Sequence, residues 1–132
     1  MEFVDNANKL EMYTIVHCGR FPKRYTFTLA HPIIGYARDV YNLVAAANEY
    51  PCTIKDYETR EKRFRAAISK LNEMVRQLGI AEELGLIRAN VMEGWIGLID
   101  RETRLIYGTI SSDKTMIKIA KDLEEKENQI GL

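Results

Sequence analysis

Apolar residues recur at steps of three and four through most of the chain, and this spacing constrains the fold more than any other feature. One such series runs through Ile33, Ala37, Val40, Val44 and Ala47. A series of this kind gives a helix one apolar face and leaves charged residues on the opposite face, as in helices packed in a bundle. The spacing therefore predicts an all-α fold.

Proline and glycine indicate where these helices end. The first should stop at Phe21-Pro22, because the residue before a proline avoids the α conformation, and the second should stop at Pro51. A third is predicted from about residue 56 to Leu78 and is followed by another, with a break at Gly79. The alternative is a single helix bent at Gly79.

The fourth helix is expected over residues 80–98, and short connections favour antiparallel neighbours. The predicted fold class is thus an up-down antiparallel four-helix bundle with a short C-terminal extension. Residues 104–110 fit either a helix end or a short strand, and Ser111-Ser112-Asp113 could cap a final acidic helix. We accordingly divide the chain into a bundle over residues 1–104 and an extension over 105–132.

Residue types with catalytic or metal-binding chemistry are few and poorly arranged. His17 and Cys18 are adjacent, so on a helix they point about 100° apart and do not form a nucleophile pair. The sequence contains no Glu-x-x-His pair and no glycine-rich phosphate loop. We expect no catalytic residue, no metal and no cofactor, and hence no enzyme, although an enzyme with a site built between subunits is a third reading.

The chain of 132 residues is long enough for one domain with a core of its own. Its apolar stretches are shorter than the roughly 20 residues of a membrane span, and its start does not resemble a signal peptide. Cys18 and Cys52 fit no metal or redox motif and are expected to be reduced thiols. These features indicate a cytoplasmic protein.

Surfaces are the better candidates for function. Basic and aromatic residues alternate around Phe21, Tyr25 and Phe27, a mixture suited to phosphates and stacked bases. The alternative is that Phe21 and Phe27 cover the end of the bundle while the basic side chains are solvated. The candidate binding residues form two groups, Arg20, Lys23 and Arg24, and then Arg60, Lys62, Arg63 and Arg65.

Gly94 and Gly97 flank Trp95 within the fourth predicted helix. Small residues allow another helix to approach closely, and the indole can then fill the adjoining groove. The sequence leaves open whether that groove belongs to the same chain or to another subunit.

Two segments resemble a known family. Phe21-Pro22-Lys23-Arg24-Tyr25-Thr26-Phe27-Thr28-Leu29 and Met92-Glu93-Gly94-Trp95-Ile96 are similar to segments of a family of small four-helix-bundle proteins. The family comprises the rRNA intervening-sequence proteins and the accessory variability determinant (Avd) proteins of diversity-generating retroelements. The resemblance covers roughly residues 8–100.

The resemblance implies a non-catalytic homopentamer that binds structured RNA and associates with a reverse transcriptase to support mutagenic cDNA synthesis. Carried over, the two basic groups are the candidate contacts, while Gly94, Trp95 and Gly97 would be structural or lie at a subunit interface. The chain departs from the family in its net charge of zero and in its acidic C-terminal extension. A different class of function is therefore kept as the alternative: a protein-interaction module with no nucleic-acid role, whose basic groups contact acidic surfaces of neighbouring subunits.

Overall fold

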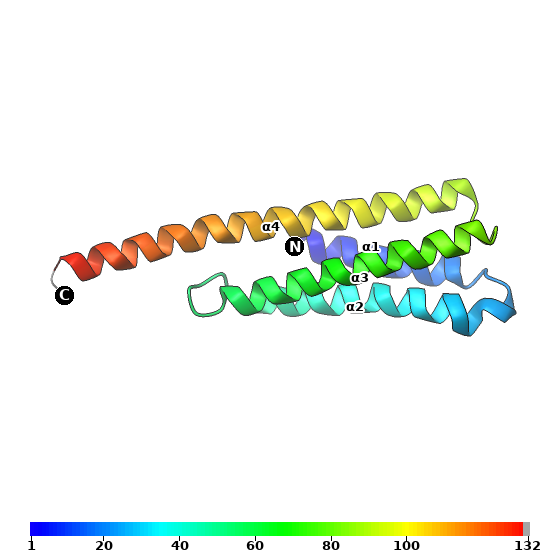
Figure 1. Cartoon of the computed structure of the whole chain (residues 1–132), viewed down its shortest axis with the longest axis horizontal. Helices are drawn as coiled ribbons and strands as arrows, with labels where there is room; N and C mark the ends of the chain where they lie inside the picture. Colours follow the sequence, from blue (N-terminus) through cyan, green and yellow to red (C-terminus); the bar gives the residue numbers. More distant parts are fainter. Residues whose placement is uncertain (131–132) are drawn as a thin grey trace.

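The computed structural model describes residues 1–130, which form a bundle of four long helices (Figure 1). The helices are α1 (Glu2–Cys18), α2 (His31–Glu49), α3 (Tyr57–Glu83) and α4 (Ala89–Gln129). Each packs against the next along the chain, and α4 also packs against α1. The predicted fold class, an up-down antiparallel four-helix bundle, is confirmed.

The apolar faces predicted from the spacing meet in one core. Leu10 of α1, Ile33 of α2, Phe64 of α3 and Trp95 of α4 are all fully buried. The Phe3 and Phe64 rings meet edge to face at 5.2 Å, which joins the start of α1 to α3. The bundle therefore buries its apolar faces within one chain.

The connection between α1 and α2 follows the prediction. α1 ends at Cys18, before Phe21-Pro22, and a 3-10 turn (Lys23–Tyr25) and a π-helical turn (Thr26–Ala30) then lead directly into α2. Tyr50, the residue before Pro51, has an extended backbone and ends α2. Both proline boundaries are confirmed.

The junction between α3 and α4 differs from the prediction. α3 continues through Gly79 in helical conformation, so the predicted break there is wrong, and so is the alternative of one bent helix. The chain turns at Gly85, whose φ of +75° is readily adopted only by glycine. The Leu86 N–H donates to the Ala81 carbonyl at 3.0 Å and the Gly85 N–H donates to the Glu82 carbonyl at 2.9 Å. These two bonds form a Schellman motif, which ends α3.

α4 is much longer than predicted. Residues 104–110 are neither a helix end nor a strand, and residues 111–113 cap nothing, because α4 runs through both without interruption. Ile106 and Ile110 are buried against the bundle, and this packing outweighs the weak helix preference of their β-branched side chains. The predicted boundary at residues 104/105 lies inside α4, and residues 131–132 of the extension fall outside the described residues.

The second half of α4 projects beyond the start of α1 (Figure 1). None of the described helices combines the length and apolar character that crossing a membrane requires. Cys18 lies at the end of α1 and Cys52 in the connection from α2 to α3, at opposite ends of the bundle (Figure 1). The two thiols are therefore too far apart to form a disulfide within one chain.

Candidate nucleic-acid interface

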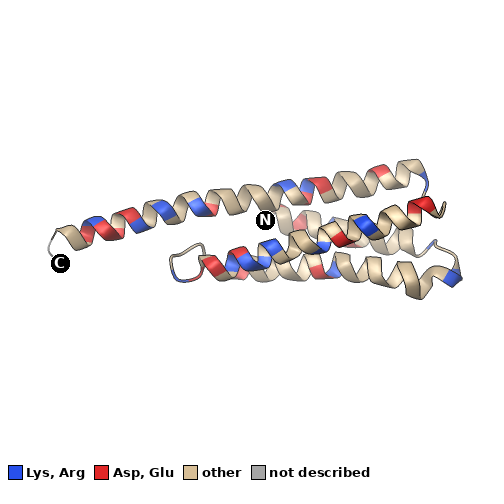
Figure 2. Cartoon of the chain, in the orientation of Figure 1, with Lys and Arg blue, Asp and Glu red and all other residues tan. Residues whose placement is uncertain are grey.

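The structure separates the two groups of basic residues predicted to bind nucleic acid. Arg20, Lys23 and Arg24 lie where α1 connects to α2, whereas residues 60–65 lie near the start of α3 at the other end of the bundle (Figure 2). The 19 residues of α2 between the two ends correspond to about 28 Å of helix. One phosphate cannot contact both groups, so they are separate candidate surfaces.

The first surface is an aromatic and basic turn, defined by Lys23, Arg24 and Phe27, whose side chains are exposed. The Phe27 side chain is 80% exposed. Among the described aromatic side chains, only His31 packs against the Phe27 ring, in an edge-to-face arrangement. Phe21 is buried instead. The interpretation that both phenylalanines cover the end of the bundle thus applies to Phe21 and is wrong for Phe27. An exposed ring beside two cations can stack on an unpaired base.

Arg60 is not an accessible contact, contrary to the prediction. It is buried, and its Nε donates to Asp113 Oδ2 of α4 at 2.7 Å. Its Nη1 donates to the Tyr50 carbonyl at 3.0 Å, and its guanidinium lies over the Phe64 ring at 5.2 Å. Arg60 therefore ties α4 to α3 and to the end of α2. Its removal would leave the Asp113 carboxylate in a largely buried site without its partner.

The other three residues of this group differ in accessibility. Lys62 and Arg65 are exposed, and Arg65 Nε donates to Glu61 Oε2 of the preceding turn at 3.1 Å. Arg63 is half-buried with its guanidinium 5.4 Å from the Tyr50 ring centre. Lys62 and Arg65 are hence the exposed residues of the predicted group, and Lys62 lines a groove with Leu43 of α2.

Sequence reasoning missed three lysines of α4. Lys114, Lys118 and Lys121 follow steps of four and three on one helix face and line a groove against Tyr57. The Lys114 ammonium lies 4.0 Å from Glu61 Oε1, the carboxylate that also holds Arg65. The spacing was visible in the sequence, but the lysines become candidates only because this segment continues α4 and packs on α3.

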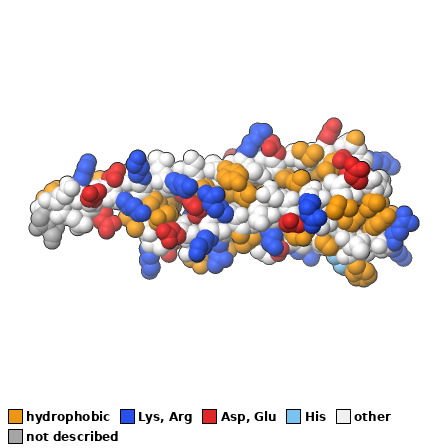
Figure 3. All heavy atoms as spheres, viewed as in Figure 1, with side chains coloured by type: hydrophobic (Ala, Val, Ile, Leu, Met, Phe, Trp, Pro, Cys, Tyr) orange, Lys and Arg blue, Asp and Glu red, His pale blue; other side chains and the backbone are white. Residues whose placement is uncertain are grey.

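The lysines of α4 and Arg65 of α3 form a second surface, which we call the basic strip. It consists of Arg65, Lys114, Lys118 and Lys121. Figure 3 shows lysine and arginine side chains gathered over the first half of α3 and the second half of α4, with acidic side chains between them. Lysine and arginine at this spacing can neutralise successive phosphates of a nucleic acid.

Trp95 and its two glycines have different roles in the structure. Trp95 is fully buried, and its indole Nε1 donates to Thr14 Oγ1 of α1 at 3.0 Å. A Cβ atom at Gly94 would overlap the hydroxyl of Tyr13, whereas one at Gly97 would meet nothing within 4 Å. Trp95 and Gly94 therefore belong to the contact between α1 and α4 of the same chain, and Gly97 faces away from it.

The groups with catalytic potential are arranged for packing. Burial raises the pKa of the Cys18 thiol to about 12, so the thiol is protonated and a poor nucleophile at neutral pH. The His17 ring packs on Tyr13 and Trp95 at centroid distances of 4.2 and 5.8 Å. Burial, together with the nearby Arg20 charge, lowers the pKa of His17. Within residues 1–130, no three His, Cys, Asp or Glu side chains gather in a way that could hold a metal ion.

The fold and these surfaces define an all-α bundle with two separate exposed basic surfaces. Comparison with protein-family models, with curated proteins and with solved structures finds no match to this chain.

Proposed function

We propose that the chain is a cytoplasmic, non-catalytic accessory protein that assembles into a homo-oligomer and binds structured RNA, a reverse transcriptase, or both. Its role would be that of the Avd proteins it resembles, support of mutagenic cDNA synthesis, and its assembly would be their pentamer. The observation that carries the proposal is the basic strip, which gathers four exposed cations from two helices. A chain with no net charge thereby presents a locally basic surface.

The strip is supported by the aromatic and basic turn at the other end. The strip offers charges for backbone phosphates, and the turn offers Phe27 for an unstacked base. The separation of about 28 Å suits a folded RNA that lies along the bundle rather than a mononucleotide.

Reversing two charges of the strip should weaken RNA binding. We expect Arg65→Glu combined with Lys118→Glu to lower the affinity for a structured RNA about tenfold or more at low salt. The slope of log affinity against log salt should fall by about two, one for each lost phosphate contact. Fluorescence anisotropy of a labelled RNA hairpin over a range of salt concentrations measures both quantities.

A matched variant separates the strip from net charge. Lys9→Glu with Arg76→Glu makes the same charge change at exposed residues outside the strip, and it should reduce binding much less. Equal binding by the wild type and the folded strip variant would exclude the strip as the RNA site.

The protein-interaction alternative is favoured by the projecting part of α4. Within the bundle, α4 faces α1 through Leu98 and Glu102, to which the Asn6 amide donates two bonds at 3.0 Å. Sequence steps of three and four place residues 105, 109 and 112 on this same face of α4, followed by Met116, Ile119 and Leu123. These last three are 54–57% exposed, because α1 begins at Glu2 and does not extend alongside them. Such spacing is typical of a seam between two helices, and we assign its occupant as α4 of a second copy.

Light scattering coupled to size exclusion distinguishes the two functions. If α4 pairs with α4 of a second copy, the wild type should form an even-numbered oligomer that does not bind RNA. Leu123→Asp should then halve the mass of that oligomer. The same change at Ile96, which is 54% exposed on another face of α4, should leave the mass unchanged. A pentamer that binds RNA at low salt and is unaffected by Leu123→Asp would instead support the accessory function, and a monomer would contradict both modes of assembly.

A further inference from the structure

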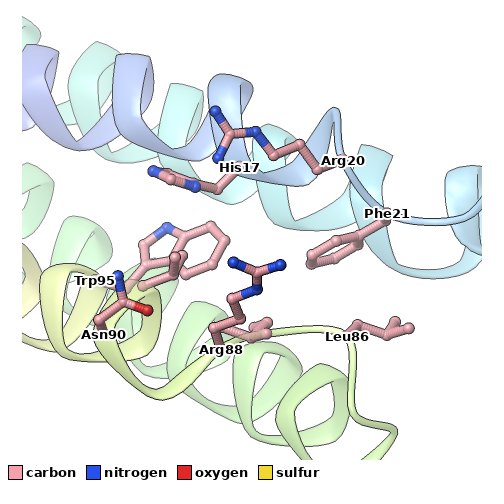
Figure 4. A pocket seen from close by; sticks show the side chains of 9 residues that line it. His17, Arg20, Phe21, Leu86, Arg88, Asn90 and Trp95 are labelled. Atoms are coloured by element: carbon pink, nitrogen blue, oxygen red, sulfur yellow. The ribbon is translucent and has the colours of Figure 1, made fainter.

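A cavity of about 420 Å³ opens at the end of the bundle where α1 ends and α4 begins (Figure 4). Its polar lining comes from His17 of α1 and Arg20 just after that helix, and from Arg88 and Asn90 at the start of α4. Phe21 is among its apolar lining residues. Sites for small ligands are commonly of this size, with a few polar groups that converge on an apolar wall.

The charge of the lining is one-sided. Two arginines line this cavity, and among the described residues no carboxylate lines it. Neither Arg20 nor Arg88 has a side-chain hydrogen bond or ion pair in the described part of the chain, whereas Arg60, Arg65 and Arg76 each bond a carboxylate. In Figure 4 the Arg88 side chain points into the space between Phe21 and Trp95, and the Arg20 side chain lies along α1 beside His17. Two arginines, each with five N–H donors, thus line one cavity without a counterion.

The other polar groups fit the same kind of ligand. Burial and the Arg20 charge lower the pKa of His17, so near neutral pH its imidazole is uncharged and can still donate one hydrogen bond. Asn90 adds an amide. The first N–H groups of α4 have no side-chain cap, and the positive end of the helix dipole lies at the same place.

We propose that this cavity binds a phosphate monoester, with the phosphate between Arg20 and Arg88 and the organic group against Phe21. Guanidinium groups bind phosphate through paired N–H donors, which matches two arginines that lack other partners. The volume exceeds that of a phosphate ion and leaves room for part of a sugar or base. The proposal goes beyond RNA binding by the strip, from which the cavity is separated by most of the length of the bundle (Figure 1).

Calorimetric titration of the full chain at low salt tests the proposal with adenosine 5′-monophosphate and adenosine as probes. We expect the monophosphate to bind and adenosine not to bind. Arg88→Gln and Arg20→Gln should each lower the affinity about tenfold or more, because each removes a charged donor pair. Arg65→Gln, the same substitution in the strip, should leave monophosphate binding unchanged.

A second titration identifies the source of the phosphate. An oligoribonucleotide with a 5′-phosphate is compared with the same oligonucleotide ending in a 5′-hydroxyl, in wild type and in Arg88→Gln. A preference for the 5′-phosphate that Arg88→Gln abolishes would assign the cavity to RNA ends. Equal binding of both oligonucleotides, alongside binding of the monophosphate, would assign it to a free phosphate ester.

Two results would overturn the proposal. One is the absence of monophosphate binding to wild type at millimolar concentration. The other is unchanged binding by Arg88→Gln whose helical circular dichroism matches that of the wild type. Since Arg65 and Lys118 lie outside the cavity, RNA binding by the strip can fail while monophosphate binding succeeds, and the reverse also holds.

Discussion

Replacing Gly94 by alanine is expected to lower the free energy of unfolding by about 2–4 kcal/mol, through overpacking and a lost hydrogen bond. The Tyr13 hydroxyl donates to the Val91 carbonyl at 2.7 Å and crosses the backbone of α4 at Gly94. An added Cβ would overlap that hydroxyl and the ring carbon that bears it. Tyr13 would have to move, and its edge-to-face contact with Trp95 at a centroid distance of 5.4 Å would move with it.

Gly97 provides the matched control, because the same substitution meets open space there. Gly97→Ala should stabilise the protein by about 1 kcal/mol, the usual gain when alanine replaces glycine inside a helix. Urea unfolding followed by circular dichroism measures both changes. Adding Tyr13→Phe to Gly94→Ala should recover part of the loss, since it removes the nearest atom. Equal effects of the two alanines would show that Gly94 is not the point of closest approach.

These two glycines show where prediction from sequence stops. Their spacing around Trp95 correctly predicts that a helix passes close by, and the buried indole fits the groove as expected. In the sequence Gly94 and Gly97 are equivalent. Only the pairing of α4 with α1 decides which of them lies under Tyr13, and that pairing is a property of the whole bundle.

The ends of the helices show a similar limit. Pro22 and Pro51 mark helix ends because a proline restricts the backbone of the residue before it, whereas Pro32 lies in the first turn of α2, where a proline is tolerated. Glycine is ambiguous: Gly79 lies inside a helix, while Gly85 takes the left-handed conformation that ends one. The sequence signal for a helix end at Gly85 was the leucine that follows it, because Leu86 can supply the apolar contact of a Schellman motif.

The candidate site was predicted in part, and Arg60 shows why the prediction was incomplete. The basic group at residues 60–65 was recognised by composition, but Arg60 stands four residues before Phe64 on the apolar face of α3. That position predicts burial, and a buried arginine needs a partner. The partner is Asp113, 53 residues away in a segment that was expected to cap a separate helix and instead lies within α4. The lysines of α4 were missed because the final helix was expected to belong to a separate extension and not to pack on α3.

Glu102 gives the second large effect, a dependence of stability on pH. This carboxyl is fully buried between α4 and α1. Asn6 Nδ2 donates to its Oε1 at 3.0 Å, and its Oε2 has no hydrogen-bond partner among the described residues. Burial raises the pKa of Glu102 to about 7, and the Asn6 bond and the Arg101 charge offset only part of this rise. The cost of burying a charge explains the direction.

The sign of the effect follows from comparing the two states. The unfolded carboxyl titrates near its ordinary pKa of 4.5, whereas the folded one holds its proton until about pH 7. Stability from Glu102 is thus fully present below pH 4.5 and is lost as the pH rises through 7, because the folded state binds more protons in between. At about 1.4 kcal/mol per pKa unit, the total loss is about 3 kcal/mol at most.

Glu102→Gln isolates this contribution, since an amide keeps the oxygen that accepts from Asn6 and cannot ionise. The free energies of unfolding of the variant and the wild type should diverge between pH 4.5 and 8, with the variant increasingly the more stable. Glu93→Gln makes the same change at an exposed position of α4 and should show no such divergence. Urea unfolding at half-unit pH steps gives the difference directly, and a difference that stays constant with pH would mean that Glu102 is ionised in the folded protein throughout. A neutral Glu102 at pH 6 would also explain how α1 and α4 stay in contact over a buried carboxyl that has only one partner.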